Sequence, residues 1–163
     1  MFNVGESGLF YNIQPSKTLT YTGDTCHGGT QSKQRLSVLL DCSVDGTEKL
    51  LPPVTGKYNK PHCFRNVKKL PTKYTANSNS WMTSTTFEEI LVQLDCQIGT
   101  KKYKNLAFID QCAAHTRDTT ALQNIEVTFF SPNCTSHLQT LDMGIIHTFK
   151  CLYRKQLIRK SVQ

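Results

Sequence analysis

The sequence predicts a single α/β domain with a mixed β-sheet flanked by helices. β-rich runs joined by turn signals occupy the first third of the chain. Helical and strand-like patterns alternate in the remainder, which is the order expected of an α/β fold. The 163 residues are enough for one domain with its own hydrophobic core.

The N-terminal strands are predicted from apolar runs and turn residues. Residues 2–13 suggest a strand, a glycine-containing interruption and a second strand, and residues 18–22 alternate with period two. Residues 35–44 form a further run, which the Asp-Gly turn at 45–46 closes. Residues 50–54 would pair with that run as an edge strand, because the prolines among them cannot donate to a ladder.

An irregular stretch, 56–80, separates these strands from the first helix. Thr85 and Glu88 have the spacing of a capping box, which predicts where the helix starts, and Gly99 is expected to end it. Apolar residues recur at spacings of three and four between these points, as on one face of a helix. The expected buried face consists of Phe87, Ile90, Leu91, Leu94 and Ile98.

Two short apolar strands, 106–109 and 125–130, and a helix from Leu138 onward complete the prediction. The single tryptophan, Trp81, is expected in the core, with stacking on a nucleic-acid base as the alternative. An apolar stripe along the last helix is also expected to belong to the core rather than to a binding site. The members of this stripe are Leu138, Leu141, Ile145, Phe149 and Leu152.

The composition narrows the classes of function. Nineteen Lys and Arg against twelve Asp and Glu give a net charge of +7, which suits nucleic acid or another polyanion. The cations near the C-terminus equally suit the negative end of a helix dipole, so the charge alone does not decide. No apolar run approaches a membrane span, no signal peptide opens the sequence, and the seven cysteines have neither zinc-site nor disulfide spacing. We therefore expect a reducing compartment, the cytosol or the nucleus.

Asp110 is the first candidate for chemistry because it follows the apolar strand 106–109 directly. A carboxylate there is costly unless it is paired or bound to a cation, and ligands bind at this edge of open α/β sheets. Capping of the turn after the strand is the alternative role.

Asp142 lies 32 residues after Asp110, in the first turns of the last helix, where the helix dipole favours negative charge. If strand 125–130 lies beside 106–109, the two carboxylates converge on one crevice, as binding of a magnesium or manganese pair requires.

Long motifs spread over nearly the whole chain carry a resemblance to one known family. They are F-N-V-G-E-S-G-L-F-Y at 2–11, C-H-G-G-x-x-S-K-x-R at 26–35, W-M-T-S-x-x-F-E-E at 81–89, F-I-D-Q-C-A-A-H at 108–115 and S-P-N-C-T-S-x-L-Q-T-L-D-M-G-I-I at 131–146. In this order they resemble the DDE transposase domain of the Tigger and pogo group, which includes jerky and centromere protein B. The resemblance implies one RNase H-like domain over 1–163. Family members carry helix-turn-helix DNA-binding domains upstream, and these residues contain none.

The resemblance also implies roles for the acidic residues. The family's second and third catalytic, metal-binding carboxylates fall on Asp110 and Asp142, with Mg²⁺ or Mn²⁺ as the cofactor. The first does not carry over, because Gly5 stands where the family pattern has an aspartate. Glu6 is a poor substitute, since adjacent strand residues point to opposite faces of a sheet. Further departures from the family pattern are Gln111, Ala113, Ser131, Thr140 and Met143.

We therefore expect a domesticated or degenerate transposase core in the nucleus. It would bind DNA weakly, mainly through phosphates, and would have lost most or all strand cleavage and joining. Two alternatives stay open. In one, the chain is an active Mg²⁺- or Mn²⁺-dependent endonuclease in which Glu6 or another acid replaces the missing ligand. In the other, it is an inert scaffold or dimerisation module, acting as a homo-oligomer.

Overall fold

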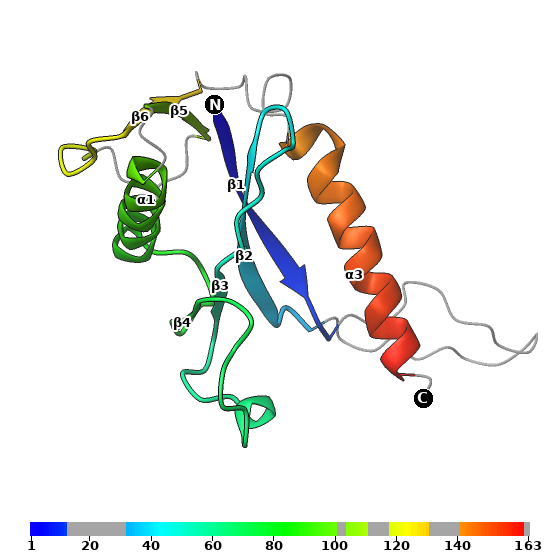
Figure 1. The fold of residues 1–163 in the computed structure, drawn as a ribbon. Helices are drawn as coiled ribbons and strands as arrows, with labels where there is room; N and C mark the ends of the chain where they lie inside the picture. The colour runs from blue at the N-terminus through cyan, green and yellow to red at the C-terminus, as the bar shows by residue number, and fades with distance from the viewer. Residues whose placement is uncertain (13–31, 101–103, 111–117, 131–140, 162–163) are drawn as a thin grey trace, which may run out of the picture.

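The computed structural model describes residues 1–12, 32–100, 104–110, 118–130 and 141–161. They form a six-stranded mixed sheet in the order β4-β3-β2-β1-β5-β6, with helices on both faces (Figure 1). This confirms the predicted fold class. Within these ranges, no helix has the length and apolar character needed to cross a membrane. The elements are β1 Phe2–Phe10, β2 Arg35–Ser43, β3 Val54–Gly56, η1 His62–Phe64, β4 Tyr74–Ala76, α1 Ser84–Gly99, β5 Asn105–Ile109, β6 Ile125–Phe129, η2 Leu141–Ile145 and α3 Ile146–Ser161.

Strand β1 is the centre of the sheet. It pairs antiparallel with β2 along all nine residues and parallel with β5 through Phe2, Asn3 and Val4. The predicted interruption within residues 2–13 is therefore wrong. Hydrogen bonding to β2 along the whole strand keeps its two glycines in the extended ladder despite their weak strand preference. The predicted strand at 18–22 lies outside the described residues.

Helix α1 covers one face of the sheet, as predicted, and all five residues of its expected apolar face are buried. Phe87, fully buried, packs in one cluster with Val4 of β1 and Ile109 of β5. The helix ends at Gly99, as predicted, but it begins before the proposed capping box. Thr83 is the N-cap, and its side-chain hydroxyl accepts a hydrogen bond from the amide of Thr86 at 3.3 Å.

The hairpin after β2 forms at the predicted turn, but its second strand begins later than predicted. Lys49 makes only an isolated bridge to Cys42, and β3 starts at Val54, immediately after the two prolines. β3 is not the edge strand either, because β4, within the stretch predicted to be irregular, pairs with it in parallel. The prolines delay the ladder because they have no amide hydrogen to donate.

The C-terminal helix lies on the face of the sheet opposite α1 (Figure 1). Its apolar stripe was predicted wrongly: Ile145 is 45% exposed and Leu152 is 58% exposed. The backbone breaks at Gly144, which has φ +154°, and α3 proper begins two residues later. This break shifts the buried positions, so that Leu141 before it and Ile146 after it are buried. Leu138 lies outside the described residues.

Candidate functional site

Asp110 lies immediately after β5, beside the central strand. Val4 of β1 is paired with Ile109 of β5, so the same parallel register, extended by one residue, sets Asp110 level with Gly5. Val4 and Ile109 both pack under α1. Because strand residues alternate between faces, the next positions along both strands, Gly5 and Asp110, belong to the opposite face. Sequence reasoning therefore placed Asp110 correctly at the carboxyl end of a buried strand.

Asp142 belongs to η2, which contacts β1 on that opposite face. Leu141, next to it, is almost completely buried and fixes this turn against the sheet. The position of Asp110 and the turn that carries Asp142 thus belong to the same face of the sheet. The parallel pairing of β5 with β6, on which their predicted convergence depended, is also present. The side chain of Asp142 lies outside the described residues.

Glu6 lies on the other face. It is paired with Leu39, a member of the core beneath α1. Its Oε1 accepts a hydrogen bond from the backbone amide of Met82, with 3.4 Å between the two atoms. The carboxylate next to Gly5 in sequence is therefore directed to the start of α1 and away from Asp110.

Asp41 of β2 is a buried carboxyl that sequence reasoning missed. It is paired with Val4 and therefore also belongs to the α1 face. The residue is 7% exposed, and its Oδ1 has no hydrogen-bond partner among the described residues. Burial raises the pKa of Asp41 to about 7. An aspartate inside the apolar run 36–42 was the available signal, and the sheet separates it from Asp110.

Two further polar residues of β1 share the face of Gly5. Asn3 and Ser7 stand two residues before and after it, and each is only 3% exposed. Buried polar residues at alternating positions of a central strand are unusual where the strand serves only the core. The period-two relation to Gly5 was a signal that could have found them. They are the neutral polar groups closest to Gly5 along β1.

The donors described at this place do not fit a pair of divalent cations. Beside Gly5 the described side chains supply one carboxylate, that of Asp110, with the neutral Asn3 and Ser7 on the same face of β1. In the described part of the chain, no group of three or more His, Cys, Asp or Glu residues is placed to hold a metal ion. A magnesium pair needs several oxygen ligands with near-ideal geometry, and carboxylates are its usual protein ligands.

Asp95 of α1 fixes the start of β6 from the other face of the sheet. Its Oδ1 accepts hydrogen bonds from the backbone amides of Gln123, Asn124 and Ile125 at 3.1, 2.7 and 2.8 Å. Burial alone would raise the pKa of this carboxyl, but the hydrogen bonds from these amides and from the Asn124 side chain prevail and lower it. The start of β6 is thereby fixed to α1, which keeps β6 in register beside β5.

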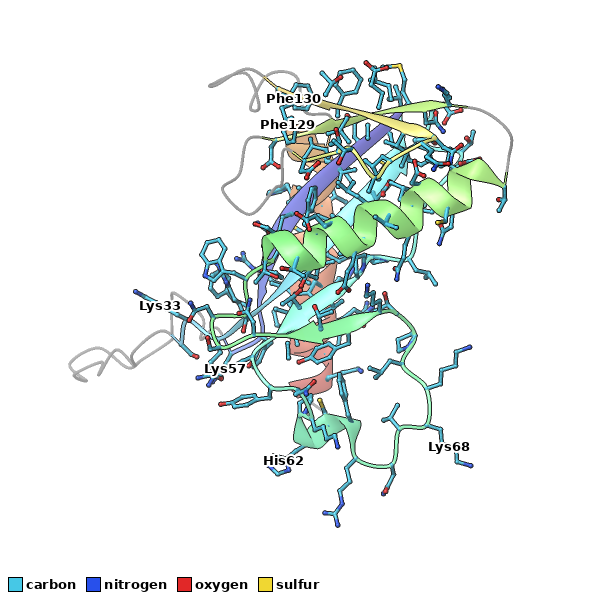
Figure 2. All side chains as sticks on the ribbon, turned by 90° about the vertical axis from the view of Figure 1, so that its left-hand side faces the viewer. Lys33, Lys57, His62, Lys68, Phe129 and Phe130 are labelled. Carbon is cyan, nitrogen blue, oxygen red and sulfur yellow. The ribbon has the colours of Figure 1, made fainter. Side chains whose placement is uncertain are left out.

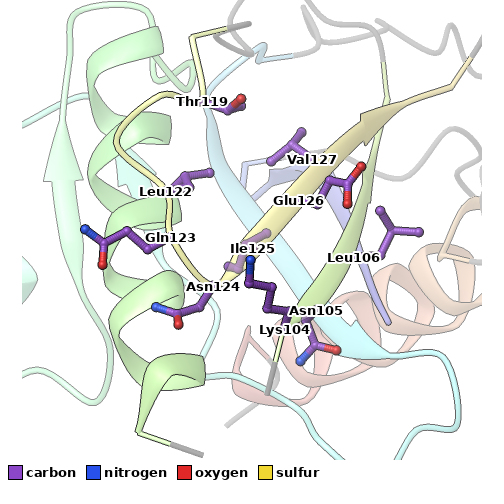
Figure 3. Close-up of a pocket in the computed structure, with 10 residues that line it drawn as sticks. All are labelled: Lys104, Asn105, Leu106, Thr119, Leu122, Gln123, Asn124, Ile125, Glu126 and Val127. Atoms are coloured by element: carbon purple, nitrogen blue, oxygen red, sulfur yellow. The ribbon is translucent and has the colours of Figure 1, made fainter. Parts of the chain in front are cut away.

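A separate hollow of about 480 Å³ lies where β5 and β6 begin, at the opposite end of β5 from Asp110 (Figure 3). It contains one cation, Lys104, and one anion, Glu126. Gln123, Asn124 and Ile125, which bond to Asp95, line it, but Gly5, Asp110 and the polar residues beside them do not. The hollow is therefore distinct from the candidate site.

A mixed sheet in which β1, β5 and β6 run parallel, with helices on both faces, is the arrangement of an RNase H-like core, the fold of the transposase class. The chain belongs to the DDE superfamily endonuclease family, whose profile matches residues 33–163.

Curated relatives agree with this assignment. The chain is 37% identical over 160 residues to Tigger transposable element-derived protein 4 of Mus musculus, which covers 98% of the chain and 31% of that protein. It is 33% identical over 162 residues to Major centromere autoantigen B of Homo sapiens, covering 99% and 26%. It is 25% identical over 159 residues to the Jerky protein homolog of Homo sapiens, covering 91% and 28%. The chain thus spans about a third or less of the length of these relatives. No solved structure matches it.

Proposed function

We propose that this chain is a transposase-derived core that binds DNA but no longer cleaves or joins strands. One observation carries the proposal: Gly5, which has no side chain, stands level with Asp110 on the face that also receives η2. The acids of β1 and β2, Glu6 and Asp41, belong to the opposite face.

The chemistry explains why this position matters. In the family, Asp110 and Asp142 would serve as metal ligands together with an aspartate at the position of Gly5. Removing that third carboxylate takes one negative charge from a site that has to hold two dications. Mg²⁺ tolerates little loss of ligand geometry, so we infer that the affinity for the metal pair, and with it strand cleavage, is lost.

The net positive charge of the chain supports the binding half of the proposal. The net charge of +7 favours contacts with phosphates, which give weak, salt-dependent binding with little sequence preference. The names of two relatives refer to a transposable element and to the centromere, both of which consist of DNA. We therefore propose duplex DNA as the partner and the nucleus as the location.

Nicking of supercoiled plasmid with Mn²⁺ tests the proposal. The unmodified chain is expected to give no nicking above buffer, and the Gly5→Asp variant is expected to gain nicking and to bind Mn²⁺ more tightly by calorimetry. Robust nicking by the unmodified chain that disappears on Asp110→Ala would falsify the inactive assignment. Failure of Gly5→Asp to gain both nicking and Mn²⁺ affinity would show that Gly5 is not the cause of the loss.

A further inference from the structure

The segment between β3 and β4, residues 57–73, has an unusual charge. It contains no Asp or Glu, and the acid-free stretch extends from Lys49 to Phe87. The net charge of the whole chain is +7, so the cations of this segment, which we call the basic protrusion, nearly account for it. They are Lys57, Lys60, Arg65, Lys68, Lys69 and Lys73.

These cations are available to a partner. The first five are exposed, whereas Lys73 is half-buried and forms an ion pair with Glu89 at 3.1 Å. Among the described residues, Lys73 is the only one of these six cations in an ion pair. Figure 2 shows Lys57 and Lys68 pointing away from the sheet at the end of the molecule opposite Phe129, with His62 between them.

The basic protrusion is held in one shape by Tyr74. The Tyr74 hydroxyl donates a hydrogen bond to the carbonyl of Tyr58 at 2.7 Å, and its ring meets Phe64 edge-on with 4.8 Å between centroids. A Cβ added to Gly56 would lie 2.2 Å from the Tyr74 hydroxyl oxygen, so only glycine lets this ring lie over the strand. At the far end, the Thr72 hydroxyl donates to the carbonyl of Pro52 at 2.6 Å.

The basic protrusion follows the carboxyl end of β3. β3 is antiparallel to β2, which is antiparallel to β1, so β3 runs in the same direction as β1 and β5. The chain therefore enters the protrusion from the carboxyl end of β3, on the same side as the carboxyl end of β5, after which Asp110 follows. Thr55 is level with Gly8 of β1 through Ser37, whereas Asp110 is level with Gly5, so the protrusion begins farther along this direction than the candidate site.

A second basic group lies near the end of β3 from which the protrusion leaves. Arg35 starts β2 opposite Phe10, the last residue of β1, and Lys33 just before it is exposed. The Arg35 guanidinium lies over the ring of Trp81, 3.4 Å from its centroid. Trp81 is 53% exposed, so its predicted place in the core is wrong. The guanidinium places a positive charge beside an exposed ring, next to the exposed Lys33.

We infer that the basic protrusion, together with the Arg35–Trp81 pair, is the surface on which the phosphate backbone of duplex DNA docks. This inference rests on the proposed function and assigns its binding surface. A protein partner is the poorer match, because the cores of protein interfaces are depleted in lysine and other charges. Cations without carboxylate partners instead gain affinity by releasing counterions from DNA.

Two triple variants of equal charge test the surface. The first, Arg65→Ala with Lys68→Ala and Lys69→Ala, removes three exposed cations of the basic protrusion. The control, Lys155→Ala with Arg159→Ala and Lys160→Ala, removes three exposed cations of α3. Binding of a short fluorescent duplex is measured by anisotropy over a series of NaCl concentrations, and thermal melting confirms that both variants fold.

The protrusion variant is expected to weaken binding roughly tenfold at low salt and to reduce the slope of log affinity against log salt by about 2 to 3, while the control changes little. A charge-conserving variant, Arg65→Lys with Lys68→Arg and Lys69→Arg, should keep binding, which separates charge from folding. Equal loss in both triple variants overturns the inference and leaves the proposed function standing. No binding by the unmodified chain overturns both. If poly-glutamate displaces the fluorescent duplex as effectively as unlabelled duplex does, the assignment of DNA as the partner of this surface is wrong.

Discussion

The carboxylate of Glu6 and the backbone amide of Met82 are joined by a hydrogen bond of 3.4 Å, on the side of the sheet that α1 covers. Met82 is buried one residue before the Thr83 cap, so this contact fixes the chain where it enters α1. The acid that neighbours Gly5 in sequence thus has a structural task of its own. It does not share a face with Asp110.

The first prediction separates the roles of these two acids. In a Gly5→Asp background, Glu6→Ala is expected to leave plasmid nicking within a few-fold, because Glu6 belongs to the opposite face. Asp110→Ala should reduce nicking by roughly a hundredfold or more, since it removes a proposed metal ligand. Single-turnover nicking with Mn²⁺ measures both. A large loss with Glu6→Ala at unchanged thermal stability would assign Glu6 to the site.

The second prediction concerns Asp95, which accepts hydrogen bonds from three backbone amides at the start of β6. Asp95→Ala leaves these buried donors without their acceptor and should reduce the free energy of unfolding by about 3 kcal/mol. Urea titration measures this loss, with the exposed Glu126→Ala as the control. Because the folded-state pKa of Asp95 is lowered, its stabilisation is complete above the unfolded-state pKa and is lost as pH falls through the folded-state value. If the free energy of unfolding falls at acidic pH as steeply in Asp95→Ala as in the unmodified chain, this prediction is wrong.

The third prediction uses the raised pKa of Asp41. Its ordinary value is 3.8, and burial moves it to about 7 in the folded protein. Between these values the folded state holds a proton that the unfolded state has lost, so stability falls as pH rises from about 4 to 7, by up to about 1.4 kcal/mol per pH unit. Asp41→Asn should remove this dependence and should be the more stable protein at pH 8 in urea titrations. Parallel pH profiles for the two proteins would be inconsistent with a protonated Asp41.

The fourth prediction concerns Gly56 and Tyr74. Gly56→Ala places a methyl group where the Tyr74 hydroxyl lies and should displace the ring, loosening the basic protrusion. Limited trypsin digestion should then cut within 57–73 several-fold faster than in the unmodified chain. Gly8→Ala is the matched control, since its added Cβ would meet only ordinary contacts with Arg35 at 3.6 Å or more. Tyr74→Phe removes only the hydrogen bond and should cost about 1 kcal/mol.

Periodicity predicted the parts of the fold in which one face is buried. The five apolar positions of α1 and the run before Asp110 follow spacings that local sequence displays, and the structure confirms them. The cap at Thr83 was missed because hydroxyl residues at 83–86 offer several similar caps, and tertiary contacts select among them. The face of Asp41 was missed because it depends on the register of β2 against β1, which no local pattern contains.

The apolar stripe of the C-terminal helix was predicted wrongly for a different reason. A stripe read through Gly144 assumes one unbroken helix, and the positive φ at this glycine displaces the phase of everything beyond it. Because of this break, the apolar spacing did not predict that Ile146, rather than Ile145, is buried against the sheet. Trp81 was assigned to the core on size alone, although an arginine can cover such a ring at the surface.

The break at Gly144 has a consequence for the candidate site. Leu141 anchors the short turn that carries position 142, whereas Ile146 and the half-buried Tyr153 anchor α3. Since Leu141 and Ile146 are buried on either side of Gly144, the turn that carries position 142 has its own contact with the sheet, separate from that of α3. Rebuilding the acidic pocket therefore calls for changes in β1 and leaves α3 free for redesign.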